Sequence, residues 1–519
     1  MQLQEFLERS FERHPEKTAL VCGGERLSYD DVERRSNRLA HALVDMGVRP
    51  GDRVAIFLEN STEAVLSIFA VLKAGAVFTM VNPTTKADKL SYMLRDSEAR
   101  ALIFHVARAE EVREAIAGLA EPVSLMTVIA RGKETKVSGL DARSFADVLE
   151  EPAGREVRPA GRGIDVDLAA LVYTSGSTGN PKGVMLTHLN MVSAATSITT
   201  YLENQPDDII LNVLPLSFDY GLYQVLMAFK FGGTVILEKS FTFPHAVLQK
   251  VAEEGVTGFP IVPTISAILL QMDLSKYSLP SLRYLTNTGA ALPTEHIERL
   301  RKAFPHARLY SMFGLTECKR VSYLPPDQLA LRPTSVGKAM PNVEVYVVDE
   351  QGTRLPAGEV GELVVRGSNV MKGYWKLPQE TERALRPGLL PGERVLYTGD
   401  LFKLDSEGYL YWVGRRDDII KSRGEKVSPK EIENVLYALE GISMAAVVGV
   451  PDPVLGQAVK AIVTCKEGFK LTVQDVQRHC ASHLEDLMVP KIIEFRDEMP
   501  RTPTGKIDKR RLATEGATG

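Results

Sequence analysis

Short apolar runs that alternate with helix-like segments are the feature that most constrains the fold of this chain. Residues 53–59 (RVAIFLE) and 100–105 (RALIFH) are predicted strands, because each is an apolar run bounded by polar residues. Residues 62–73 between them have helical spacing and stop at Ala74-Gly75, a helix-ending signal. Further strand-like runs lie at residues 209–214, 234–237 and 258–262. This alternation predicts an α/β protein with parallel sheets and covering helices.

The pattern changes after about Gly352, where short predicted strands separated by turns begin. These strands lie at residues 359–366, 396–403 and 409–414. They are typical of a small, mainly antiparallel, β-barrel-like unit. Helices at residues 429–439 and 473–483 then alternate with strands at 445–449 and 458–464. We therefore expect a large domain of residues 1–416 and a small α+β domain of residues 417–519.

Composition and charge exclude several classes of protein. The 519 residues allow about three to four domain-sized units. The net charge of −4 lacks the basic excess of a duplex-binding protein, and no apolar run reaches the roughly 18 residues of a membrane span. The amphipathic N-terminal segment has no signal-peptide pattern, and the four cysteines form no C-x-x-C pair. We therefore expect a cytoplasmic protein with no nucleic-acid partner and no membrane span.

A loop of small residues follows the predicted strand at residues 168–173 (LAALVY). It reads TSGSTGNPKG from Thr174 to Gly183. Small residues let backbone N–H groups approach an anion, the hydroxyls can donate to phosphate oxygens, and Lys182 supplies positive charge. The loop matches neither a Walker A spacing nor a nucleophile elbow. We therefore interpret it as a phosphate-binding loop rather than as a flexible linker.

This loop resembles the pyrophosphate loop of the adenylate-forming superfamily, which comprises acyl-CoA synthetases, the adenylation domains of peptide synthetases, and luciferases. More motifs of that superfamily follow in its order, at residues 287–292 (NTGAAL), 312–317 (MFGLTE), 397–400 (YTGD), 414–417 (GRRD) and 503–509 (PTGKIDK). The resemblance covers essentially the whole chain and implies that the small C-terminal domain is mobile. It also implies two steps: ATP and a carboxylate give an acyl-adenylate and pyrophosphate, and a thiol then displaces AMP.

The resemblance assigns most nucleotide contacts by position. It implies that Glu317 holds Mg²⁺, that Thr316 contacts the adenylate phosphate and that Asp400 accepts both ribose hydroxyls. A hard cation such as Mg²⁺ prefers few protein carboxylates together with phosphate oxygens. Arg415 is expected at the ribose or phosphate, whereas Arg416 is expected to be solvated. The other expected nucleotide-binding residues are Thr174, Ser175, Gly176, Ser177, Thr178, Gly179, Gly289, Ala290, Ala291, Met312, Phe313 and Gly314.

The small domain holds residues that the resemblance links to catalysis and to the thiol. Lys506 is expected to contact the carboxylate and the α-phosphate oxygens in the first step. Asp417 matches the hinge about which the small domain rotates. In the second step Gly424 is expected to let the pantetheine arm pass, and Lys426 to meet the nucleotide of coenzyme A. The expected catalytic set is Lys506, Thr316, Glu317 and Lys182.

The acyl pocket is expected around residues 215–224 (PLSFDYGLYQ). By the resemblance, Phe218 is the aromatic residue that gates the thiol tunnel, and an Asp at the position of Asp219 pairs the substrate amine in amino-acid-adenylating relatives. Arg320 is unusual in an apolar pocket. It could neutralise Asp219, which we prefer because it comes from the same chain, bind a second carboxylate, or point to solvent. The expected pocket residues are Phe218, Asp219, Tyr223, Thr288, Met312, Arg320 and Val321.

Two interpretations of the function follow. The leading one is an ATP-dependent, AMP-forming carboxylate–thiol ligase of the acyl-CoA synthetase type, with ATP, Mg²⁺ and coenzyme A as cofactors and a small carboxylic acid as substrate. The alternative is a stand-alone enzyme that activates a proline-like amino acid and loads the phosphopantetheine of a separate carrier protein. A catalytically inactive nucleotide-binding protein is a third interpretation, and intact Lys506, Glu317 and Asp400 argue against it. His188 is expected to pack at a helix start rather than to act in catalysis.

Overall fold

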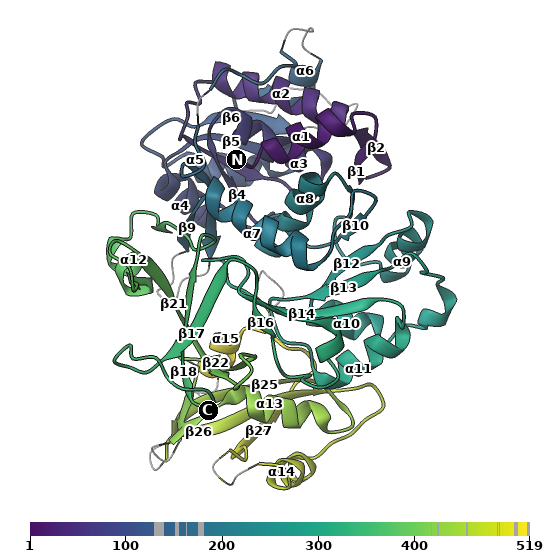
Figure 1. Cartoon of the computed structure of the whole chain (residues 1–519), viewed down its shortest axis with the longest axis vertical. Coiled ribbons are helices and arrows are strands. Elements are labelled where there is room, and N and C mark those ends of the chain that lie inside the picture. Colours follow the sequence, from purple (N-terminus) through teal and green to yellow (C-terminus); the bar gives the residue numbers. More distant parts are fainter. Residues whose placement is uncertain are drawn as a thin grey trace.

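The computed structural model describes residues 1–128, 140–150, 155–161, 163–174, 181–416, 418–422, 425–452, 455–484, 486, 488–502 and 507–515. Within these residues the strands form two large sheets and two smaller ones. Most strands of the large sheets belong to the purple-to-teal part of the chain, and the C-terminal part lies at the opposite end of the molecule from α1 and α2 (Figure 1).

One large sheet has eight described strands in the order β19-β9-β8-β4-β3-β5-β6-β7. They are β3 (Arg53–Phe57), β4 (Val77–Met80), β5 (Ala99–His105), β6 (Ser124–Val128), β7 (Ala142–Ser144), β8 (Leu168–Thr174), β9 (Lys182–Thr187) and β19 (Gly373–Tyr374). The strands from β8 to β7 pair in parallel, as the alternation predicts. β9 returns antiparallel to β8, with Thr174 opposite Lys182, so the expected phosphate loop joins two neighbouring strands.

The other large sheet has nine described strands in the order β16-β15-β14-β13-β12-β10-β11-β1-β2. They are β1 (Thr18–Cys22), β2 (Glu25–Ser28), β10 (Ile209–Asn212), β11 (Thr234–Leu237), β12 (Gly258–Ile261), β13 (Tyr284–Asn287), β14 (Arg308–Phe313), β15 (Ser322–Leu324) and β16 (Lys338–Ala339). Strands β12, β13 and β14 pair in parallel. Their carboxyl ends therefore bring the segments after Asn287 and Phe313 to the same edge, which is where parallel α/β sheets bind ligands.

A layer of helices lies between the two large sheets. It contains α1 (Glu5–Arg13), α2 (Tyr29–Asp45), α3 (Thr62–Lys73), α7 (His188–Tyr201) and α8 (Asp219–Phe231). Their buried side chains share one hydrophobic core with residues of both sheets. Helix α3 is apolar around nearly its whole circumference, which is expected of a helix covered on all sides.

Other helices cover the outer faces and the connections. They are α4 (Ala87–Ser97), α5 (Ala109–Ile116), α6 (Phe145–Leu149), α9 (Pro244–Glu253), α10 (Pro263–Leu269) and α11 (Thr294–Ala303), with short 3₁₀ turns at Val106–Arg108, Leu274–Lys276 and Pro326–Gln328. Helices α4 and α5 pack on the outer face of the eight-stranded sheet and form a second hydrophobic core there.

The predicted antiparallel unit is a five-stranded sheet. It consists of β17 (Val343–Val348), β18 (Val360–Gly367), β20 (Leu385–Pro387), β21 (Arg394–Leu404) and β22 (Leu410–Arg415), with α12 (Pro378–Ala384) beside it. All of its strand pairs are antiparallel. This confirms the predicted change of pattern.

The C-terminal part has its own sheet and its own hydrophobic cores. The described strands are β23 (Ile420–Ser422), β24 (Glu425–Val427), β25 (Ile442–Asp452), β26 (Gly456–Cys465) and β27 (Ile492–Phe495), and the helices are α13 (Pro429–Ala438), α14 (Val473–Ala481) and α15 (Lys509–Glu515). One core lies under α13 and α14, and a second includes Leu512 of α15.

The N-terminal segment and His188 pack against each other. Leu3, Phe6 and Leu7 are buried, as their helical spacing predicts. The backbone N–H of Leu3 donates to Nδ1 of His188, the first residue of α7, at 3.1 Å. Burial lowers the pKa of His188 to about 4, which keeps the ring neutral and able to accept this bond. The structural role expected for His188 is confirmed.

Among the described residues, no helix has the length and apolar character needed to cross a bilayer.

Candidate active site

The phosphate-loop motif is fixed at both of its ends. Thr174 ends β8 and Lys182 begins β9. Lys182 Nζ forms an ion pair of 2.5 Å with Glu380 of α12 and lies 5.6 Å from the centre of the Tyr374 ring. Glu380 also pairs with Arg383 one helical turn later, at 2.8 Å. The predicted loop residues Ser175, Gly176, Ser177, Thr178 and Gly179 lie outside the described residues.

Glu317 is held by a tyrosine of the neighbouring sheet edge. The hydroxyl of Tyr374 donates to Glu317 Oε1 at 2.7 Å, and the backbone N–H of Met371 donates to the Glu317 carbonyl at 2.7 Å. Burial and the charge of Glu317 both raise the pKa of Tyr374, so the tyrosine stays a donor. The Glu317 carboxylate is only partly buried and has a second oxygen available for a hard cation, so its chemistry fits Mg²⁺. Thr316 lies beside it and is also partly buried.

Among the described carboxylates of the nucleotide motifs, Asp400 is the most enclosed. Its side chain is 4% exposed, and Arg415 of the adjacent strand reaches it with Nε 3.0 Å from Oδ1. The indole N–H of Trp412 also donates to Oδ1, at 3.3 Å. The register of β21 and β22 places Asp400 opposite Arg415, so the sheet itself sets this pair. Arg416 is exposed, as expected, and forms an ion pair with Glu362 at 3.3 Å.

The expected adenine platform follows β13. The side-chain amide of Asn287 donates to the Ala290 carbonyl at 2.9 Å, which fixes the turn. Gly289 has a φ of +86°, a conformation that favours glycine. Ala290 and Ala291 are exposed, so their small side chains leave a flat, accessible surface.

The segment after β14 is packed too closely for a larger residue at Gly314. A Cβ at Gly314 would lie 2.2 Å from the carbonyl oxygen of Lys319. Met312 is buried, and its Sδ accepts a hydrogen bond from the Tyr201 hydroxyl at 3.0 Å. Phe313 is partly buried. Met312 is therefore a buried residue beneath the predicted nucleotide site and is not exposed on its surface.

Asp219 is neutralised by Lys319. The Lys319 Nζ donates to the Asp219 carbonyl at 2.8 Å and lies 3.4 Å from the Asp219 carboxylate. Lys319 is buried, and burial lowers its pKa to about 7 although Asp219 opposes that effect. The expectation that Arg320 pairs with Asp219 is therefore wrong. A lysine one position earlier, whose backbone has a φ of +63°, supplies the charge to the first residue of α8.

Arg320 is buried without an ion pair among the described residues. It is 2% exposed, so it does not point to solvent. Its Nε and Nη1 have no hydrogen-bond partner in the described part of the chain. Its Cζ lies 5.6 Å from the centre of the Tyr220 ring. Two of the three expected fates of Arg320 are thus excluded.

The other predicted pocket residues are buried or partly buried. Phe218 is the partly buried N-cap residue of α8 and meets Tyr220 edge-on at 6.3 Å. A cavity of about 10 Å³ lies beside Asp219 and Leu222, with room for about one water molecule. The remaining predicted pocket residues, Tyr223, Thr288 and Val321, are buried.

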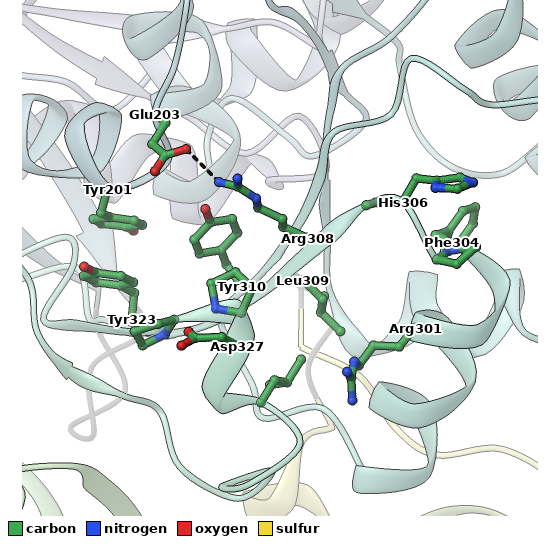
Figure 2. Close-up of a pocket in the computed structure, with 15 residues that line it drawn as sticks. Tyr201, Glu203, Arg301, Phe304, His306, Arg308, Leu309, Tyr310, Tyr323 and Asp327 are labelled. Carbon is green, nitrogen blue, oxygen red and sulfur yellow. Dashed lines mark hydrogen bonds and ion pairs between the residues drawn. The ribbon is translucent and has the colours of Figure 1, made fainter.

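A larger cavity lies at the other end of β14. Its volume is about 690 Å³, and it contains none of the predicted site residues. Figure 2 shows Tyr201, Tyr310 and Tyr323 along one side and the ion pair between Glu203 and Arg308, which is 2.6 Å long. The ring of Tyr201 stacks on Tyr323 with 4.0 Å between centres. Tyr201 also contacts Met312, so this aromatic stack joins the cavity wall to one of the predicted pocket residues.

Several predicted residues are not tested by the geometry. Lys506, Asp417 and Gly424 lie outside the described residues, and Lys426 lies in β24. Conversely, sequence reasoning missed Lys319, Tyr374 and Glu380. The Lys-Arg pair in an otherwise apolar segment was a signal for Lys319, whereas Tyr374 and Glu380 lie far from any nucleotide motif in the sequence.

The two-sheet fold and the shared edge of its motifs define an adenylate-forming enzyme. The AMP-binding enzyme family matches residues 7–375, and the AMP-binding enzyme C-terminal domain matches residues 431–506. The chain therefore belongs to the AMP-binding enzyme family.

Three similar proteins illustrate the match. A feruloyl-CoA synthase of an Amycolatopsis species is 37% identical over 95% of each chain. A long-chain-fatty-acid–CoA ligase of Bacillus subtilis is 31% identical over 99% of this chain and 94% of its own length. The structure of ATP-bound MatB from Rhodopseudomonas palustris has a TM-score of 0.90 at 30% identity and covers 100% of this chain and 99% of that one. The chain is thus an AMP-forming acid–thiol ligase.

Proposed function

We propose that this enzyme joins a small carboxylic acid to coenzyme A, with Mg²⁺ as the metal. The observation that carries the proposal is the pair of placed carboxylates, Glu317 bonded to Tyr374 and Asp400 bonded to Arg415. The carboxylate of Glu317 is partly exposed and suits a cation, whereas that of Asp400 is enclosed and suits the two hydroxyls of a ribose. The likeness to CoA ligases along nearly the whole chain supports coenzyme A as the acceptor. Because ATP and coenzyme A are cytoplasmic, we place the reaction there.

In the first step two anions must meet, so positive charge has to offset their repulsion. We propose that Lys182 and the loop from Thr174 to Gly179 bind the β- and γ-phosphates. The adenine lies against Gly289, Ala290 and Ala291, beside the 312–314 segment, and Asp400 and Arg415 position the ribose. Thr316 and Lys506 contact the α-phosphate, where the substrate carboxylate oxygen attacks. Mg²⁺, when bound by Glu317, supplies further charge to the phosphates.

In the second step the thiol attacks the acyl carbonyl and AMP leaves. We propose that residues 1–416 and 417–519 are the two domains and that the small one rotates about Asp417. Gly424 then lies along the pantetheine arm, Lys426 meets the nucleotide of coenzyme A, and Phe218 borders the thiol tunnel.

The amino-acid alternative has less support. A substrate amine would need Asp219 as its counter-ion, but Lys319 already occupies that carboxylate. A second ammonium group would also be repelled by Lys319 and by Arg320. The pocket therefore favours an acid without an amine.

The experiment is product analysis with ATP, Mg²⁺, coenzyme A and single acids from fatty, aromatic, dicarboxylic and amino-acid classes. We expect AMP, pyrophosphate and an acyl-CoA thioester in equal amounts with at least one non-amino acid. Activity with proline alone, or thioester formation only on a carrier protein, would contradict the proposal.

A further inference from the structure

Residues 369–374, here called the connecting segment, join the two sheets that supply the proposed nucleotide site. Lys182 begins β9 of the eight-stranded sheet, whereas Glu317 follows β14 of the nine-stranded sheet. The connecting segment ends in β19, which pairs antiparallel with β9. The ring of Tyr374 in β19 has its centre 5.6 Å from Lys182 Nζ. One end of the segment is therefore fixed beside the lysine that is proposed to bind phosphate.

The other end of the connecting segment is bonded to the backbone around Glu317. The side-chain amide of Asn369, which is 1% exposed, donates to the carbonyls of Cys318 at 2.7 Å and Arg320 at 2.9 Å. The backbone N–H of Met371 donates to the Glu317 carbonyl at 2.7 Å. The connecting segment therefore fixes the main chain of Glu317 relative to β9.

The side chain of Glu317 depends on a single bond from the same segment. The Tyr374 hydroxyl donates to Glu317 Oε1 at 2.7 Å, and the residues that the structure describes form no other hydrogen bond and no ion pair with this carboxylate. A glutamate side chain has several rotatable bonds, so a carboxylate without this donor would sample several rotamers. Oε2 receives no bond from the tyrosine and stays available to a cation.

We propose that Tyr374 is a positioning residue for the metal carboxylate and that it acts through Glu317. This inference rests on the proposed function, in which Glu317 holds Mg²⁺. The hydroxyl keeps the carboxylate ordered before ATP and the metal bind. Hydrogen-bond partners of metal-ligating side chains typically contribute about 10–100-fold to metal affinity.

The Tyr374→Phe variant isolates this role. It removes the hydroxyl but keeps the ring beside Lys182 and the backbone pairing of β19. A tyrosine that only filled space would therefore be replaced without loss. The matched control is Tyr411→Phe in β22, which also removes a hydrogen bond from a tyrosine hydroxyl to a carboxylate, here Asp405 Oδ2 at 3.2 Å.

The test is the equilibrium binding of ATP to the whole enzyme, measured by calorimetry without any acid substrate, once with EDTA and once with saturating Mg²⁺. The ratio of the two Kd values is the gain in ATP affinity that the metal provides. We expect Mg²⁺ to tighten binding in the wild type and in Tyr411→Phe. Tyr374→Phe should lose most of this gain, while its Kd for metal-free ATP stays near the wild-type value.

An unchanged gain in Tyr374→Phe would overturn the inference, and so would an equal weakening of both Kd values, which would indicate a structural role. Glu317→Gln is the reference, and adding Tyr374→Phe to it should change neither Kd further. A further change would show that the tyrosine does not act through Glu317.

The same measurements separate the inference from the proposed function. If Mg²⁺ gives no gain in the wild type, or if Glu317→Gln keeps the full gain, the proposed role of Glu317 fails and the inference fails with it. If Glu317→Gln loses the gain but Tyr374→Phe keeps it, the role of Glu317 stands and only the inference is contradicted.

Discussion

Lys319 makes the stability of the large domain depend on pH. Burial lowers its folded-state pKa to about 7, against an ordinary lysine value of about 10.5. Between these values the unfolded chain binds one more proton, so the free energy of unfolding rises with pH in this window. From pH 7.5 to 9.5 the gain is about 2 kcal/mol. The Lys319→Met variant should not show this gain in the free energy of unfolding.

The measurement is the thermal unfolding midpoint of both proteins at the two pH values. The double variant Asp219→Asn, Lys319→Met is the control, because it also removes the carboxylate that Lys319→Met leaves unpaired. Both variants should show the same flatter pH dependence. If the unfolding midpoint changes by the same amount between the two pH values in wild type and in Lys319→Met, the lysine keeps an ordinary pKa.

Lys506 is expected to act in the first step alone. Lys506→Ala should lower adenylate formation by about 10²–10³, the typical cost of one preorganised donor to a developing charge. Thioester formation from a preformed acyl-adenylate should persist if, as proposed, rotation of the small domain takes the lysine out of the site. The two half-reactions are measured separately by pyrophosphate release and by thioester yield. An equal loss in both would count against the domain rotation.

At the scale of single residues, the sequence predicted that Asp219 needs a cation, but it did not predict which residue supplies that cation. Lys319 rather than Arg320 meets Asp219, and the local backbone there has a φ of +63° at Lys319, which sequence spacing does not encode. The roles of Tyr374 and Glu380 could not be predicted from sequence spacing either. They reach Glu317 and Lys182 only because β19 pairs with β9 across a long stretch of sequence.

Helix α12 holds Lys182 in an ion pair with Glu380. While this ion pair is formed, Lys182 is less available to phosphate, so Glu380→Gln should lower the KM for ATP. A partly exposed pair is worth up to about 1 kcal/mol, which corresponds to a change of roughly two- to five-fold. The control is Glu382→Gln, an exposed glutamate on the same helix. A higher KM for ATP in Glu380→Gln alone would instead show that the pair orients Lys182 for binding.

Elements were predicted best where burial alone defines them. Helix α3 was predicted at its observed bounds, and β11 likewise, because both are mostly apolar and end at clear signals. The strand predicted at residues 445–449 runs from Ile442 to Asp452. Its ends are defined by backbone pairing with β26, which continues past the apolar residues as far as Pro451 and Asp452. Hydrophobic pattern carries no information on such pairing.

The whole molecule is proposed to work in two arrangements of its domains. In the arrangement that this structure has, Nζ of Lys466 in the C-terminal part lies 3.8 Å from Oε1 of Glu295 in α11. Asp417→Pro fixes φ near −65° and should hinder rotation about this residue. Adenylate formation should be largely kept, and thioester formation should fall by at least about ten-fold. Asp417→Ala, which removes the carboxylate but leaves φ variable, should retain more of the second step.

Normal thioester formation in Asp417→Pro would place the hinge elsewhere. Equal losses in Asp417→Pro and Asp417→Ala would assign the effect to the carboxylate. Both results would be read from single-turnover transfer of a preformed acyl-adenylate to coenzyme A.

The central claim is that the acid is activated as an adenylate. The direct measurement is oxygen transfer from an acid labelled with ¹⁸O in its reacting carboxylate. When a carboxylate oxygen attacks the α-phosphorus and the thiol later displaces AMP, that oxygen leaves with AMP. Mass spectrometry should therefore find one labelled oxygen in AMP and none in pyrophosphate. Label in inorganic phosphate, with ADP as the nucleotide product, would contradict the account.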